Sequence, residues 1–166
     1  MAMQIDVATI SDVPRLAELL GILFEQEEEF TPDRAAQERG LRRIIDDASL
    51  GHVLVLRDGA GVIGMVSLLF SVSTALGDGV ATLEDMVVAP ERRGGGVGSA
   101  LLTAAIEHAR QAGCRRITLL TDRSNASAQR FYGRHGFQLS DMVPMRLALD
   151  GQVSREHEPG AYGKLK

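Results

Sequence analysis

The spacing of apolar and polar residues predicts an alternation of short strands and longer helices. Gln4–Ala8 alternates as a half-buried strand does. A helix beginning near Ser11 or Asp12 follows, with leucines at helical spacing: Leu16, Leu19, Leu20 and Leu23. Thr31-Pro32 is predicted to open a second helix, with Leu41, Ile44 and Ile45 on its apolar face.

The remaining pattern completes an α+β fold. Two apolar runs, 52–57 and 62–71, flank Asp58-Gly59-Ala60-Gly61, which predicts a hairpin because glycine supplies the positive φ of tight turns. Further strands are expected at Val80–Val88, Arg116–Thr121, Phe137–Leu139 and Met145–Leu149, and further helices at 98–111 and 124–134. We therefore predict a central, largely antiparallel mixed sheet of about six to seven strands, with helices on both faces.

Length and composition narrow the classes of protein. The chain has 166 residues, which at about 150 residues per domain indicates one domain over 1–150, followed by a polar tail over 151–166. A net charge of −4 is a poor match for nucleic acid or an anionic membrane. A single Cys excludes an intrachain disulfide, and the four histidines show no metal-binding spacing. No basic, apolar leader opens the sequence, so we expect a cytoplasmic protein.

A glycine-rich segment between a predicted strand and a predicted helix is the strongest chemical signal. Gly94–Gly96 are consecutive and Gly98 follows. Glycines let the backbone approach a ligand closely, and their N–H groups, with the helix N-terminus, suit phosphate oxygens. Arg92 and Arg93 add positive charge at the loop entrance.

Three readings of this loop can be compared with known patterns. A Walker A loop requires a Lys after the glycines, and this loop has none. A dinucleotide fingerprint requires a third glycine, but Ser99 or Leu101 stands at that position in the two possible registers. A plain glycine-rich turn at a helix start is the third reading. It is disfavoured because three consecutive glycines cost more backbone entropy than such a turn requires.

The loop resembles the (Q/R)xxGx(G/A) signature of the GNAT superfamily of acyl-CoA-dependent N-acyltransferases. Arg93-Gly94-Gly95-Gly96-Val97-Gly98 matches it, and residues 125–137 resemble the second motif of the family, N…A…FYxxxGF. The resemblance extends to about Leu149 and implies a GNAT-like N-acetyltransferase that uses acetyl-CoA as acyl donor. The acceptor would be a small-molecule or peptide amine, attacked directly in a ternary complex. Members often dimerise, so a homodimer is one state that the resemblance allows.

The resemblance also implies a set of cofactor contacts. The amides of the loop would hold the pyrophosphate, and the strand before the loop and an Asn after it would hold the pantetheine arm. The implied residues are Met86, Val87, Val88, Arg93, Gly94, Gly95, Gly96, Val97, Gly98, Ser99 and Asn125.

Two catalytic residues are predicted from the needs of the reaction. Tyr132, at its motif position, would protonate the leaving thiolate, although a core aromatic is the alternative. Within the family a carboxylate on the strand before the loop commonly takes the amine proton. Alternation places Glu84 and Asp85 on opposite faces of that strand, and we choose Glu84 as the base, with Asp85 or a water as alternatives.

Other features carry less functional signal. Glu25–Glu29 could attract a cationic acceptor, but a solvated acidic helix face is the plainer reading. Cys114 opens a strand, which indicates a structural Cys rather than a nucleophile. An acyl-CoA-binding module or sensor without turnover is the alternative function, which the joint presence of Tyr132, Asn125 and Glu84 disfavours.

Overall fold

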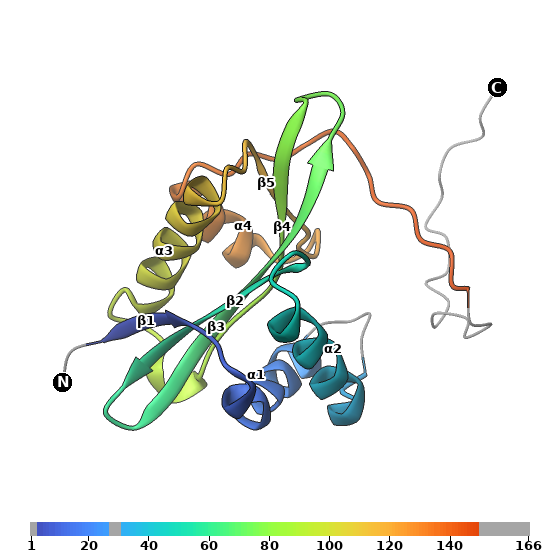
Figure 1. Ribbon diagram of the computed structural model, residues 1–166. Helices are drawn as coiled ribbons and strands as arrows, with labels where there is room; N and C mark the ends of the chain where they lie inside the picture. The colour runs from blue at the N-terminus through green and yellow to red at the C-terminus, as the bar shows by residue number, and fades with distance from the viewer. Residues whose placement is uncertain (1–2, 27–30, 150–166) are drawn as a thin grey trace.

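The computed structural model describes residues 3–26 and 31–149 and has a five-stranded sheet at its centre (Figure 1). The strands are β1 (Gln4–Val7), β2 (Gly51–Asp58), β3 (Gly61–Ser73), β4 (Asp78–Val88) and β5 (Ile117–Leu119). They lie side by side in chain order. The first four are antiparallel, and β5 runs parallel to β4, so the sheet is mixed as predicted.

Helices cover both faces of this sheet, which confirms the predicted α+β fold. They are η1 (Ile10–Asp12), α1 (Val13–Gln26), α2 (Arg34–Asp46), η2 (Pro90–Arg92), α3 (Val97–Gln111) and α4 (Ala126–Arg134). Helices α1 and α2 pack on one face, and α3 and α4 on the other (Figure 1). Among the described residues, none of these helices is long and apolar enough for a membrane crossing.

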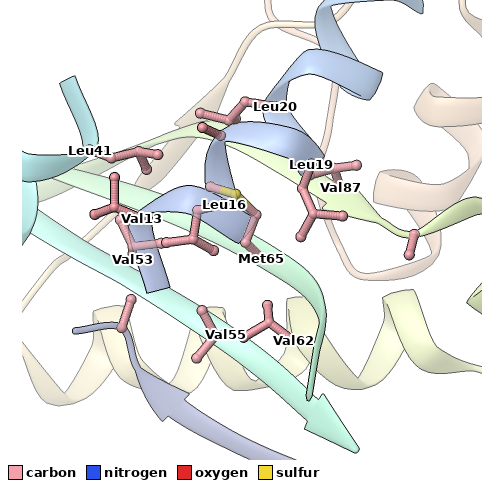
Figure 2. Packing of buried hydrophobic residues seen from close by; sticks show 13 residues of the cluster. Val13, Leu16, Leu19, Leu20, Leu41, Val53, Val55, Val62, Met65 and Val87 are labelled. Atoms are coloured by element: carbon pink, nitrogen blue, oxygen red, sulfur yellow. The ribbon is translucent and has the colours of Figure 1, made fainter. Parts of the chain in front are cut away.

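The two faces of the sheet carry two separate cores. On one face, leucines of α1 and Leu41 of α2 pack on Val53, Val55 and Met65 (Figure 2). On the other face, Leu101, Leu102 and Ala105 of α3 pack on Leu54, Leu56 and Leu68. Both faces of β2 are therefore buried, which explains why its sequence is an apolar run rather than an alternation.

The first helix is anchored to the sheet by a buried carboxylate. Asp12 accepts a hydrogen bond from the backbone N–H of Thr9 at 2.8 Å and two from the Arg57 guanidinium, at 2.9 and 2.7 Å. The bonds from Arg57 hold the pKa of the Asp12 carboxyl below its usual value. Helix α2 begins at Arg34 rather than at Thr31-Pro32, and Asp33 is its N-cap, whose side chain accepts from the N–H of Ala36.

The predicted strand count is wrong at the C-terminal end. Phe137–Leu139 and Met145–Leu149 form no strand, and β5 ends at Leu119 instead of Thr121. Alternation alone does not make a strand, because a strand needs the edge of another strand to bond to. The predicted tail, 151–166, lies outside the described residues.

Candidate functional site

Three successive glycines shape the loop that leads into α3. Gly94, Gly95 and Gly96 have φ of +93°, +59° and +82°, and Gly96 is the N-cap residue of the helix. L-residues rarely adopt these angles, so the backbone conformation requires glycine here. A Cβ at any of the three positions would meet no heavy atom of the described residues within 4 Å, and all three glycines are exposed.

The backbone of this loop and of the first turn of α3 is suited to an anion. The N–H of Val97 bonds to Gly94 at 3.3 Å and that of Ala100 to Gly96 at 2.9 Å. The N–H groups of Gly98 and Ser99 have no partner within the helix, as in any first helical turn. Together with the helix dipole, they offer partial positive charge to phosphate oxygens.

Both loop arginines are engaged by the protein. The Nε atom of Arg93 donates to the carbonyl of Val88 at 3.0 Å, and Arg92 forms an ion pair with Asp58 of the β2–β3 hairpin, also at 3.0 Å. These contacts tie the loop to β4 and to the hairpin. An open hollow of about 740 Å³ separates the hairpin from the loop, and the residues lining it include neither Tyr132 nor a carboxylate of β4.

Beside this loop, residues 84–88 of β4 are no longer paired with β5, and we name this unpaired edge of β4 the gap. Strand β5 pairs only with residues 81–83 of β4, although β4 continues to Val88. In an antiparallel pair, every second residue is hydrogen-bonded to the neighbouring strand. The N–H of Ala89 bonds to the carbonyl of Ile63 in β3, so Val87, two residues earlier, is the next residue of β4 that bonds to β3. The backbone N–H and C=O groups of Met86 and Val88 therefore point away from β3, into the gap.

Val87 is not brought to this gap. Its backbone faces β3, and its side chain is buried in the core under α1 (Figure 2). Alternation along the strand, which assigns Met86 and Val88 to one side, assigns Val87 to the other.

Helix α4 brings Tyr132 to the gap. The hydroxyl of Tyr132 lies 4.0 Å from the sulfur of Met86, and its ring packs edge-on against Phe131 and Phe137, at interplanar angles of 69° and 67°. The Cα of Gly98 faces Phe131, since a Cβ there would meet that ring at 3.6 Å. The Tyr132 ring is thus held by packing, with its hydroxyl beside β4.

Asn125 has a structural role at the start of α4. Its side-chain oxygen accepts from the N–H of Ala128 at 3.0 Å, which caps the helix. The side chain is exposed to solvent. The contact to the pantetheine arm that the sequence motif implied stays a prediction.

A β-bulge in β4 overturns the expected orientation of its two carboxylates. Val66 pairs with Met86 and Leu68 with Leu83, so Glu84 and Asp85 together face the single residue Ser67. The extra residue resets the alternation: Leu83 and Met86 pack on the α3 side, although an undisturbed strand would place them on opposite faces. Glu84 and Asp85 consequently share the α1 face, and the prediction of opposite faces is wrong.

Asp85 is the more buried of the two carboxylates. Its N–H donates to the hydroxyl of Ser67 at 3.1 Å, and that hydroxyl donates back to the Asp85 carboxylate at 3.1 Å. Burial raises the pKa of Asp85 to about 6, against the lowering effect of the Ser67 hydrogen bond and with a smaller contribution from the charge of Glu84. Glu84, by contrast, is exposed.

We expect Asp85→Asn to stabilise the fold at neutral pH. The folded-state pKa of about 6 exceeds the reference value of 3.8, so the contribution of Asp85 to stability is fully present below about pH 3.8 and is lost as pH rises through about 6. Asn carries no charge and can still accept from Ser67. Thermal unfolding should show a higher midpoint for Asp85→Asn than for wild type at about pH 7.5, and a smaller difference at about pH 4. Equal midpoints at both pH values would contradict the burial cost, and Glu84→Gln serves as the exposed control.

The other residues considered in the sequence analysis add no further group to this site. Burial raises the pKa of the Cys114 thiol. In the described ranges, no three His, Cys, Asp or Glu side chains are grouped as metal ligands are. His52 and His108 approach to 2.7 Å between Nδ1 and Nε2, a contact that no local motif predicts. Glu25 is exposed, and Glu27–Glu29 lie outside the described residues.

The chain matches known acetyltransferases in sequence and fold. The model of the acetyltransferase (GNAT) family matches residues 14–137. The aminoalkylphosphonate N-acetyltransferase of Salmonella typhimurium is 35% identical over 108 residues, covering 65% of this chain and 70% of that protein. An uncharacterized N-acetyltransferase of Bacillus subtilis is 29% identical over 139 residues, covering 82% and 90%. An integron cassette protein from a salt-marsh metagenome superposes with a TM-score of 0.77 at 25% identity, covering 88% and 90%.

Proposed function

This chain belongs to the GNAT acetyltransferase family, and from that premise we propose that it moves an acetyl group from acetyl-CoA to a primary amine in a ternary complex. One observation carries the proposal. The exposed glycine loop at the start of α3 adjoins the backbone of β4 where β5 has diverged, so an anion site and an open strand edge are contiguous.

The cofactor contacts follow from these backbone groups. The N–H groups of Gly94–Ser99 would hold the pyrophosphate, and the gap-facing groups of Met86 and Val88 would bond to the amides of the pantetheine arm. Arg93 would have to release the carbonyl of Val88 for that carbonyl to bond to the arm. When bound, acetyl-CoA supplies an activated acyl group as a thioester.

The groups proposed as proton donor and base, the Tyr132 hydroxyl and a carboxylate of β4, lie on opposite faces of β4. Tyr132, on the α4 side, would give its hydroxyl proton to the departing thiolate. The carboxylates lie on the α1 side, from which the amine would approach. Glu84 as the base stays a prediction, but the geometry favours Asp85, because burial brings its pKa closer to neutrality.

Asp85→Asn and Glu84→Gln separate these two candidates for the base. A base with a pKa of about 6 is active when ionised, so kcat/KM of the wild type should fall as pH drops below about 6. We expect Asp85→Asn to lower kcat/KM by about tenfold or more at neutral pH and to remove this acidic limb. Glu84→Gln should retain the limb. The opposite pattern would assign the role to Glu84, and an intact limb in both variants would assign it to a water or another segment.

An acceptor screen tests the activity itself. The protein is incubated with acetyl-CoA and a panel of primary amines, and release of the CoA thiol is followed. The panel includes aminoalkylphosphonates, because the relative from Salmonella is named for that substrate class. Binding of acetyl-CoA without thiol release for any amine would favour a binding module without turnover.

The cytoplasmic location expected from the sequence stays a prediction.

A further inference from the structure

A buried hydroxyl interrupts the apolar middle of β3. Ser67 is 1% exposed, and its neighbours Met65, Val66 and Leu68 are fully buried apolar residues. Val66 and Leu68 pack on the α3 side of the sheet, so alternation places Ser67 on the α1 side, where Met65 also packs. A hydroxyl in such a position costs free energy unless it is hydrogen-bonded, so its role is to be sought in its hydrogen-bond partners.

Ser67 is hydrogen-bonded to Asp85 in two ways. Its Oγ accepts from the backbone N–H of Asp85 at 3.1 Å and donates to Oδ2 of the Asp85 carboxylate, also at 3.1 Å. A hydroxyl has a single proton, so the proton of Ser67 is committed to the carboxylate. The other carboxylate oxygen, Oδ1, has no hydrogen bond to a described residue, which leaves it open to another donor.

Few charges surround this carboxylate. Strand β3 has no ionisable side chain. The charged residues of α1, which packs over this face, are Arg15 and Glu18, bonded to each other at 3.0 Å, and Glu25, which is exposed. Burial raises the pKa of the Asp85 carboxyl, the hydrogen bond from Ser67 lowers it, and the charge of Glu84 raises it further. The uncharged Ser67 therefore favours the ionised form of Asp85 against its surroundings.

We propose that Ser67 is a positioning residue for acetyl transfer: its hydroxyl holds the Asp85 carboxylate in one orientation at the bulge, with Oδ2 occupied and Oδ1 presented to the acceptor amine. The inference rests on the proposed function, in which Asp85 takes the amine proton. A carboxylate that is already held needs no reorientation when the amine arrives, and it must be ionised to accept a proton. This role also accounts for a hydroxyl within an apolar core.

Titration of the Asp85 carboxyl carbon by NMR tests the contact on the free protein, without an acceptor. The signal is assigned through its absence in Asp85→Asn. In wild type its midpoint should lie at about pH 6. Ser67→Ala removes the hydroxyl and should raise the midpoint by about half a pH unit or more, whereas Ser67→Thr, which retains a hydroxyl and suits a strand, should restore it. Equal midpoints in wild type and Ser67→Ala would overturn the inference.

The pH profile of turnover tests the positioning itself. With an amine that supports thiol release, Ser67→Ala should move the acidic limb of kcat/KM to higher pH, as in the titration. Well above the limb, Asp85 is ionised in both proteins. There kcat should still fall by about tenfold, with the KM for the amine nearly unchanged, because the carboxylate is no longer held.

Val80→Ala is the control for lost packing. Val80 is buried in β4 and pairs with Ser71, away from the bulge, so this variant should lose stability and keep the wild-type limb and kcat. A limb and a kcat that Ser67→Ala leaves at their wild-type values would overturn this inference alone. A limb that persists in Asp85→Asn would instead overturn the proposed role of Asp85, and this inference with it.

Discussion

Gly96→Glu should lower the affinity for acetyl-CoA by at least about 100-fold, which corresponds to about 2.8 kcal/mol of binding free energy. Gly96 is the N-cap of α3 with φ +82°, and its N–H lies among those proposed to hold the pyrophosphate. Glutamate there puts a negative charge where two phosphate groups would lie, and its backbone strain of about 1–2 kcal/mol favours a changed loop conformation. Isothermal titration calorimetry measures the loss.

Gly77→Glu is the matched control for the strain. Gly77 has φ +65° and a Cβ there would also meet nothing within 4 Å, but it lies in the β3–β4 turn. Both variants should lose similar stability, and only Gly96→Glu should lose the cofactor. If Gly96→Glu bound acetyl-CoA as tightly as Gly77→Glu does, the glycine loop would not be the cofactor site.

Tyr132→Phe should reduce kcat by about 100-fold or more and leave the affinity for acetyl-CoA nearly unchanged. Phenylalanine retains the ring that packs on Phe131 and Phe137 and removes only the hydroxyl beside Met86. A loss confined to kcat is what removal of a proton donor to the leaving group produces. Steady-state kinetics at saturating acetyl-CoA, together with calorimetry, separates the two quantities.

Phe137→Leu tests whether packing rather than chemistry explains such a loss. Phe137 contacts the Tyr132 ring with a centroid distance of 5.6 Å and has no hydroxyl. The Phe137→Leu variant should lower the midpoint of thermal unfolding more than Tyr132→Phe does, and should lower kcat less. A kcat of Tyr132→Phe within about twofold of wild type would leave Tyr132 as a packing residue.

Much of the fold could be predicted from local pattern because its causes are local. The β2–β3 hairpin depends on turn glycines, and α3 depends on an apolar stripe that ends at a glycine. The glycine loop is equally local: three successive positive φ angles require three glycines wherever they occur. The candidate cofactor site could therefore be located from residues 93–99 before its surroundings were known.

The remaining features depend on which strands lie side by side. The orientation of Glu84 and Asp85 is set by a register shift opposite Ser67, 17 residues before Glu84, and alternation within β4 cannot reveal it. Burial, which raises the pKa of Asp85, is likewise a property of the packed sheet. The strand count failed for a related reason: Met145–Leu149 has the alternation of a strand but pairs with no strand among the described residues. Local sequence pattern was enough to predict most helices and strands and the glycine loop, because their backbone conformation depends on neighbouring residues. Strand register, burial and strand partners depend on contacts between residues far apart in the chain, so only the tertiary structure determines them.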